Sequence, residues 1–229
     1  GVLHLTILIE QMRREGYELA VSRPEVIMRQ VEGEMHEPYE AVTIDVDHIH
    51  QGIVMEQMGR RRAQLEQMEQ GQDGRIILHF ICAARGLIGF YTEFLTLTSG
   101  SGILTHVFSH YDKAHSEAIA PRRYGVMVAN GAGRAVGYAL FNLQERGQLF
   151  VHPQTEVCKG MLVGICAKEH DLHVNVMKGK KLTNVRASGS DENVILIPPL
   201  RVTLEYALSF IEDDELVEVT PKHIRIRKK

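Results

Sequence analysis

Residues 178–190 are the part of the chain whose residue types and spacing could do chemistry. The segment reads KGKKLTNVRASGS and holds four cations and no acidic residue. Lys and Arg supply charge and hydrogen-bond donors, whereas Gly, Ser and Thr let backbone amides approach an anion closely. The pattern therefore predicts a phosphate-binding loop, with nucleic acid as the natural ligand. A solvated basic loop without a ligand remains the alternative, because runs of charge are common on protein surfaces.

The overall composition does not indicate such a ligand. The formal net charge of the chain is −3. Residues 1–112 carry 9 Lys and Arg against 16 Asp and Glu, whereas residues 113–229 carry 17 against 13. A uniformly basic nucleic-acid-binding surface is therefore excluded, and the basic character is local to the second half of the chain.

The composition also limits the class of protein. A chain of 229 residues with 44% apolar residues can bury sizeable cores. It has no apolar run of roughly 18–20 residues and no signal-peptide pattern, so we expect no membrane span and a cytoplasmic location. Its three cysteines, Cys82, Cys158 and Cys166, form no CxxC pair. Buried thiols in a reducing compartment are expected rather than disulfides or a zinc site.

The first 35 residues have the pattern of half a domain. Apolar residues at helical spacing predict a helix over about residues 2–15, ended by Gly16. Two short β-prone runs follow, at 17–21 and 26–31, and we expect them to belong to a sheet whose other strands are missing from this chain. Because the helical pattern opens without a capping signal, the chain is expected to be a piece of a longer protein.

Residues 36–112 repeat one order of elements twice. Strands are expected at 41–47, 63–68, 75–82 and 103–110, and helices at 52–62 and 86–98. This β-α-β-β-α-β order predicts a ferredoxin-like domain with both helices on one face of an antiparallel sheet. The order alone says nothing about function.

Residues 113–229 are expected to form a β-rich domain. Its predicted strands lie at 126–129, 135–140, 149–151, 161–167, 173–177, 194–197, 216–219 and 223–227. One helix is expected over residues 204–211. The glycines of Gly131-Ala132-Gly133 are interpreted as a hairpin turn between two of the strands. The predicted fold class is therefore α+β: half of a ferredoxin-like domain (1–35), a complete one (36–112) and a β-rich domain (113–229).

Several motifs resemble known families. Residues 1–10 (GVLHLTILIE), 12–16 (MRREG) and 22–26 (SRPEV) resemble domain III of the elongation-factor-G class of translational GTPases. Residues 84–90 (ARGLIGF), 98–102 (TSGSG), 108–112 (FSHYD) and 179–189 (GKKLTNVRASG) are similar to the BipA/TypA group of ribosome-associated GTPases. The resemblance spans essentially the whole chain.

The resemblance implies the second half of domain III, domain V and the C-terminal domain specific to that group. It implies docking in the ribosomal A-site region, with large-subunit rRNA and tRNA as partners and the basic loop directed toward the tRNA acceptor arm and the peptidyl-transferase region. The parent protein would act as a monomer in translation under stress and in large-subunit assembly.

The residues expected to contact RNA lie almost entirely in the basic loop. They are Lys178, Gly179, Lys180, Lys181, Arg186, Ser188 and Gly189, with the cations on phosphates and the small residues allowing a close fit. Arg85 is a weaker candidate, because it could equally form a salt bridge at a helix start. Without an aromatic platform, the loop is expected to recognise RNA shape and backbone rather than bases.

Catalytic alternatives find little support in the sequence. No G-x-x-x-x-G-K-[ST] motif occurs, so we expect no GTP or Mg²⁺ site here and no enzyme activity, although the parent protein would hydrolyse GTP. The pairs His48/His50 and His106/His110 lack a nearby third ligand, so no metal site is expected. No serine lies in a G-x-S-x-G elbow. The remaining alternative is a protein-interaction module whose basic loop binds an acidic protein partner.

Overall fold

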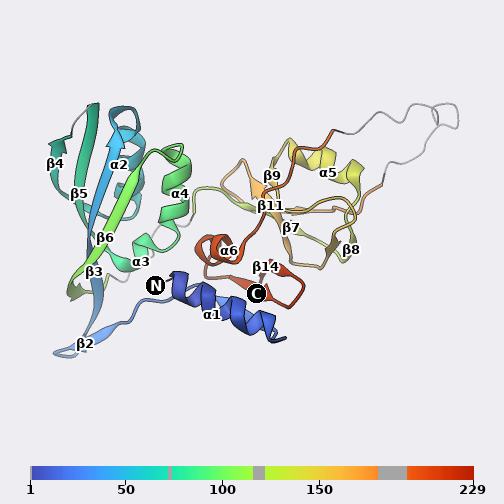
Figure 1. Cartoon of the computed structure of the whole chain (residues 1–229), viewed down its shortest axis with the longest axis horizontal. Helices are drawn as coiled ribbons and strands as arrows, with labels where there is room; N and C mark the ends of the chain where they lie inside the picture. Colours follow the sequence, from blue (N-terminus) through green and yellow to red (C-terminus); the bar gives the residue numbers. More distant parts are fainter. Residues whose placement is uncertain (1, 72–73, 116–121, 180–194) are drawn as a thin grey trace, which may run out of the picture. The chain divides into compact units, whose positions relative to one another are not determined.

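The chain forms two compact units, which are described separately (Figure 1). The computed structural model describes residues 2–71, 74–115, 122–179 and 195–229. One unit comprises residues 23–121 with 208–210, and the other comprises 1–22, 122–207 and 211–229. Both mix helices and sheets, so the expected α+β class is confirmed. None of the helices in these ranges is both long enough and apolar enough to cross a membrane.

The unit of residues 23–121 is built on one antiparallel sheet. Its strands are β2 (Arg29–Val31), β3 (Glu34–Asp47), β4 (Gln64–Gln70), β5 (Arg75–Ala83) and β6 (Ile103–Lys113). The hydrogen-bonded order is β4-β5-β3-β6, with β2 also paired to β3, and all of these pairs are antiparallel. The four predicted strands of this region are all present, and β3 starts seven residues earlier than expected.

Helices cover one face of this sheet. They are η1 (His48–His50), α2 (Gln51–Arg60), α3 (Ala84–Leu87) and α4 (Phe90–Leu97). Alternate residues of β3 and β5, such as Ile44 and Leu78, pack with Met58 and Phe94 in one buried cluster. The single helix expected over 86–98 is divided in two, because Gly89 adopts a φ of +78° that a continuing helix does not allow.

The second unit carries a four-stranded sheet of order β12-β7-β11-β9. Its strands are β7 (Val126–Ala129), β9 (Gly147–Leu149), β11 (Leu162–Cys166) and β12 (Leu172–Val174). β7 and β12 run parallel, whereas the other pairs are antiparallel. Helix α5 (Gly137–Gln144) contributes Leu140 to a core that includes Met127, Val163 and Val174.

Three predictions for this unit were wrong. The run at 135–140 belongs largely to α5, because a short apolar run reads alike as a strand or as a buried helix segment. Gly133 starts β8 (Gly133–Arg134), which pairs with β10 (Glu156–Val157), so Gly131–Gly133 is not a hairpin turn between paired strands. The described part of the expected strand at 194–197 has no regular structure.

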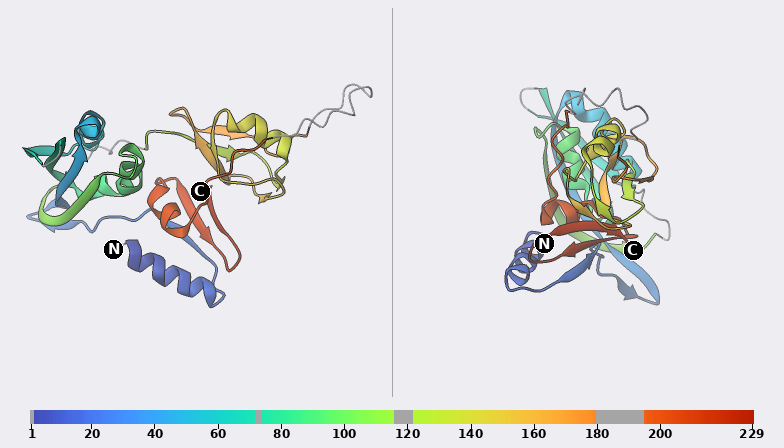
Figure 2. Two further views of the ribbon diagram at one scale, coloured as in Figure 1. Left: turned by 45° about the horizontal axis from the view of Figure 1, so that its top comes forward. Right: turned by 90° about the vertical axis from the view of Figure 1, so that its right-hand side faces the viewer.

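The N-terminal strand finds its neighbour at the opposite end of the chain. β1 (Leu19–Ser22) pairs antiparallel with β13 (Glu215–Val219), which pairs with β14 (Ile224–Lys228). Helix α1 (Val2–Arg14) lies beside this sheet (Figure 2), and Arg13 Nε donates to the Thr220 carbonyl at 2.8 Å. The expectation that the runs at 17–21 and 26–31 belong to a sheet whose other strands are missing was therefore wrong, since β1 pairs with β13 and β2 pairs with β3. Local sequence pattern cannot reveal a pairing about 200 residues distant.

A buried ion cluster joins the C-terminal hairpin to the four-stranded sheet. The Glu215 side chain is fully buried and accepts from Arg122 at 2.5 and 2.9 Å and from Lys228 Nζ at 2.9 Å. Lys228 also contacts Asp171 at 2.7 Å. Asp171 in turn accepts from the backbone N–H of Val126 in β7 at 2.9 Å. The cluster thus connects β13, β14 and β7.

Each charge in the cluster is favoured by its neighbours. Burial by itself raises the pKa of Glu215, but the hydrogen bond and charge of Arg122 outweigh burial, so this pKa lies below its ordinary value. Burial also raises the pKa of Asp171, but Lys228 and the Val126 amide outweigh burial, so this pKa too lies below its ordinary value. Burial lowers the pKa of Lys228, yet its three carboxylate partners raise it above the ordinary range.

The cluster makes a prediction about stability. Replacing Glu215 by Gln removes the carboxylate that pairs with Arg122 through two hydrogen bonds and with Lys228, and we expect a loss of about 3–5 kcal/mol in unfolding free energy. Hydrogen exchange at the amides of Val217 and Ile226 reports this unit separately from the other. The matched control is Glu218→Gln on the same strand, whose partner Arg227 is half-exposed, and it should cost less than about 1 kcal/mol.

The same cluster predicts an acid sensitivity. Carboxylates with a lowered folded-state pKa stabilise the fold above their unfolded pKa, roughly 4, and that contribution is lost as the pH falls through the folded value. The opening free energy at Val217 should therefore decrease below about pH 4. Glu215→Gln should make this dependence shallower. An equally steep dependence in the variant would show that other groups control acid unfolding.

Candidate nucleic-acid interface

The basic segment leaves the second unit from a fixed point. After β12, Val176 is buried, and its carbonyl accepts from the backbone N–H of Val136 at 2.9 Å. The Asn175 side chain accepts from the N–H of Met177 at 2.9 Å, which closes a local turn. Lys178 and Gly179 follow directly, and both are exposed. The first cation of the predicted site therefore stands at a defined place on the surface.

The chain returns to the same unit through a side chain of α5. Gln144 Nε2 donates to the carbonyl of Ile195 at 3.1 Å, and Gln144 Oε1 accepts from the N–H of Ile197 at 3.0 Å. Further on, the N–H of Leu200 donates to the carbonyl of Leu149 in β9 at 2.8 Å. One glutamine thus pairs with both a carbonyl and an amide of an otherwise irregular stretch of backbone.

The described chain before residue 180 and after residue 194 is therefore attached to one folded core. Five of the predicted contact residues lie outside the described residues, and their role stays a prediction: Lys180, Lys181, Arg186, Ser188 and Gly189. The described residues on either side provide a fixed base for the segment. A fixed base lowers the entropy that must be lost when cations dock onto a ligand.

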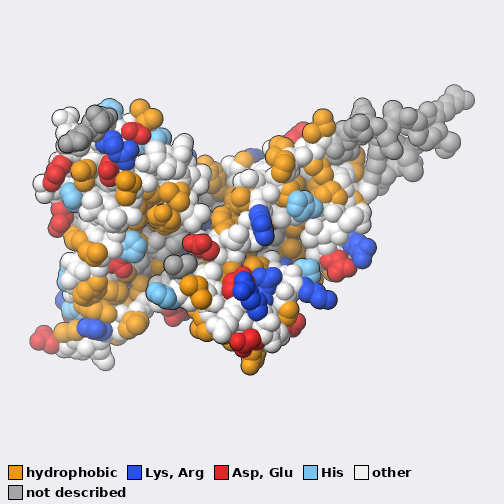
Figure 3. Space-filling view, viewed as in Figure 1, with side chains coloured by type: hydrophobic (Ala, Val, Ile, Leu, Met, Phe, Trp, Pro, Cys, Tyr) orange, Lys and Arg blue, Asp and Glu red, His pale blue; other side chains and the backbone are white. Residues whose placement is uncertain are grey.

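Lys178 differs from most cations visible on this unit. In Figure 3 the Lys and Arg side chains gather over β14. There, Arg227 contacts Glu218 and Lys228 contacts three carboxylates, so much of that charge is neutralised within the protein. Within the described ranges, Lys178 forms no ion pair.

Arg85 is held inside the other unit. Its guanidinium contacts the fully buried Glu37 at 2.5 and 3.2 Å and donates to the carbonyl of His115 at 2.8 Å. The backbone N–H of His115 donates to the same carboxylate at 3.0 Å. These contacts support the alternative of a salt bridge at the start of α3, and an RNA contact by Arg85 stays a prediction.

Both histidines of the pair His106/His110 have contacts of another kind. His106 Nδ1 contacts Glu40, and the His110 ring stacks on Tyr39 with centroids 5.5 Å apart. Across the described ranges, no group of three or more His, Cys, Asp and Glu side chains could hold a metal ion.

Sequence reasoning missed the residue that anchors the returning chain. Gln144 is the last residue of α5. The first half of this helix, residues 137–140, was predicted to be part of a strand. A helix over this run would have placed Gln144 at a helix end, but its two hydrogen bonds reach residues more than 50 positions away. No local signal in the sequence points to that contact.

Comparison with known proteins gives two family matches. Residues 124–229 match the family model "TypA/BipA C-terminal domain", and residues 34–120 match "Elongation factor G C-terminus". The chain is 55% identical over its whole length to "Large ribosomal subunit assembly factor BipA" of Escherichia coli K12. The factors of the same name from Haemophilus influenzae and Buchnera aphidicola are 54% and 52% identical over all of this chain.

The chain covers only part of the length of these relatives. The chain spans 38% of the length of the Escherichia coli relative and 37% of that from Haemophilus influenzae. Both family models describe C-terminal domains, and they follow one another along the chain. The chain therefore carries a TypA/BipA C-terminal domain preceded by a domain of the elongation factor G C-terminus type, and it corresponds to the C-terminal part of BipA/TypA proteins.

Proposed function

We propose that this chain is the ribosome-binding part of a BipA-type assembly factor and that the basic segment 178–190 contacts RNA phosphates. The relatives are named as assembly factors of the large ribosomal subunit, which supports the ribosome as partner. The observation that carries the proposal is that the described residues on either side of residues 180–194, up to Gly179 and from Ile195, belong to one core, with Lys178 exposed.

The proposal includes a domain assignment. Residues 1–35 correspond to the second half of domain III, 36–112 to domain V and 113–229 to the family-specific domain. The order β4-β5-β3-β6 with two helical segments on one face supports a ferredoxin-like domain V. The pairing of β1 with β13 means that the first and last segments share one sheet.

The chain binds rather than catalyses in this proposal. GTP hydrolysis, with its Mg²⁺, belongs to a GTPase domain elsewhere in the parent protein. The present part docks as a cytoplasmic monomer in the ribosomal A-site region, with domain V near the stalk base. The basic segment then points toward the tRNA acceptor arm and the peptidyl-transferase region, and the parent protein acts in subunit assembly and in translation under stress.

The first prediction concerns ribosome binding and salt. Changing Lys178, Lys180, Lys181 and Arg186 to Ala removes four positive charges, so association with purified large subunits should weaken. The slope of log affinity against log salt should become shallower by about 3 to 4, because fewer counterions are released. Sedimentation of the chain with large subunits across a salt series measures both quantities.

The control removes the same charge elsewhere in the second unit. Lys159, Lys168, Arg201 and Lys222 are all exposed, and their joint change to Ala also replaces three lysines and one arginine. This variant should keep most of the affinity and of the slope. Equal losses in the two variants would show that total charge, rather than the segment, determines binding. If the interaction resists both salt and competitor RNA, an acidic protein partner becomes the better interpretation.

The second prediction concerns the anchor of the returning chain. Gln144→Ala removes the acceptor for the Ile197 amide, so exchange of that amide should accelerate about tenfold. Ribosome affinity should fall several-fold while the buried β11 amides keep their protection. Gln148→Ala, on the exposed side of β9, is the matched control and should change neither property. Unchanged exchange at Ile197 in Gln144→Ala would refute the anchoring role.

A further inference from the structure

A polar pocket of about 500 Å³ lies beside the base of the basic segment. It forms where β7 and β12 end, and these two strands are parallel, with Ala129 opposite Val174. Asn130 and Asn175 each come directly after one of the two strands, and both line the pocket. The carboxyl ends of parallel strands meet at one edge of a sheet, and crevices at such edges are where open sheets with helices bind ligands.

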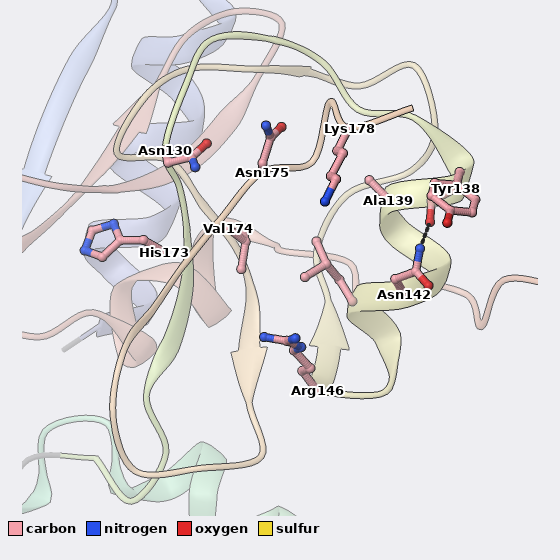
Figure 4. Close-up of a pocket in the computed structure, with 10 residues that line it drawn as sticks. Asn130, Tyr138, Ala139, Asn142, Arg146, His173, Val174, Asn175 and Lys178 are labelled. Carbon is pink, nitrogen blue, oxygen red and sulfur yellow. Dashed lines mark hydrogen bonds between the residues drawn. The ribbon is translucent and has the colours of Figure 1, made fainter. Parts of the chain in front are cut away.

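Among the described residues that line the pocket, the charged side chains are both cationic. Its lining includes Arg146, which follows α5, and Lys178, which follows β12, but no Asp or Glu. Figure 4 shows Lys178 at one end of the pocket, with its ammonium directed inward, and Arg146 at the other end. Within the described ranges, neither cation forms an ion pair. Two cations that line one pocket provide charge and donors for a dianionic group such as phosphate.

The neutral side chains of the pocket offer both donors and acceptors. Asn142 Nδ2 donates to the Tyr138 carbonyl at 2.7 Å, which leaves Asn142 Oδ1 to accept from a ligand. Asn175 Oδ1 accepts from the Met177 amide, which leaves Asn175 Nδ2 to donate. The backbone N–H of Asn130 donates to the Val174 carbonyl. The Asn130 side chain takes no part in that hydrogen bond, so it adds a third side-chain amide to the pocket.

Apolar groups complete the lining. Ala139 and Val174 are buried, and Leu143 is partly buried, so they form a floor on which a flat ring or a ribose can rest. The His173 ring points away from the two cations (Figure 4). A single phosphate ion would leave most of the volume unfilled, whereas the pocket lies within the range of roughly 300–1,000 Å³ used by small organic ligands.

We propose that this pocket binds one nucleotide unit, with Arg146 and Lys178 on its phosphate and the asparagine amides on its base or ribose. The inference deepens the proposed function, because Lys178 begins the segment assigned to RNA. The shared chemistry is a phosphorylated nucleoside, and its source is either a nucleotide within an RNA strand or a free nucleotide.

The test uses the 229-residue chain with three probes: 5′-AMP, inorganic phosphate and a single-stranded RNA of five nucleotides. Amide chemical shifts of Asn130, Asn175 and Arg146 report occupancy of the pocket. Arg146→Gln should weaken binding of the nucleotide probes by about tenfold or more, because a charge-assisted contact is lost. Asn130→Asp places a negative charge in the pocket at constant size and should weaken binding similarly.

Arg134→Gln is the matched control, since Arg134 is exposed in the same unit and lies outside the pocket. Weakening of both AMP and RNA by the pocket variants supports a site open to a free nucleotide. Weakening of RNA alone supports a nucleotide within a strand. The proposal is overturned if no probe shifts these amides, if phosphate binds as well as AMP, or if Arg146→Gln behaves like Arg134→Gln.

The pocket and the proposed function can fail separately. A variant with Lys180, Lys181 and Arg186 changed to Ala keeps the whole pocket, so it should still bind the nucleotide probe that the native chain binds. Loss of that binding would overturn the pocket assignment. If the native chain does not sediment with large subunits but AMP still binds through Arg146, the proposed function fails and the pocket remains.

Discussion

The buried carboxylate of Glu215 is the constraint on which the second unit depends. A carboxylate without solvent must be paired, and here Arg122 and Lys228 supply the counter-charges. Through Lys228 and Asp171, the same cluster reaches the backbone of β7. The hairpin of β13 and β14 is thereby fixed to the sheet that carries the basic segment. Because β1 pairs with β13, this constraint extends to the N-terminal strand as well.

The ion pairs made by the cations of β14 explain why the net charge of the chain does not indicate the proposed RNA interface. These cations are largely neutralised by carboxylates of the same unit, so they contribute to stability more than to ligand attraction. Lys178 and Arg146 form no such pairs within the described ranges. A chain with an overall charge of −3 can therefore still present local positive charge, because acidic residues elsewhere cancel it in the sum but not in space.

The arrangement at the base of the basic segment combines two requirements. Cations that dock on RNA must be reachable, whereas their starting point must be fixed so that little order is lost on binding. The turn at Asn175 fixes the chain just before the segment, and the two hydrogen bonds of Gln144 fix the chain at Ile195 and Ile197. The pocket lies at the end of β12, shortly before the basic segment begins. Lys178 therefore belongs both to the fixed base and to the basic segment.

The sequence by itself determined the local elements and the candidate chemistry. The strands of residues 36–112, the helix before Gly16 and the cation run at 178–190 follow from periodicity, glycine placement and charge, which are properties of neighbouring residues. Only the tertiary structure decided that β1 pairs with β13, that residues 137–144 form a helix and that Gln144 and Arg146 adjoin the basic segment. These features depend on contacts between residues far apart in the chain, and such contacts leave no periodic signal in a single sequence.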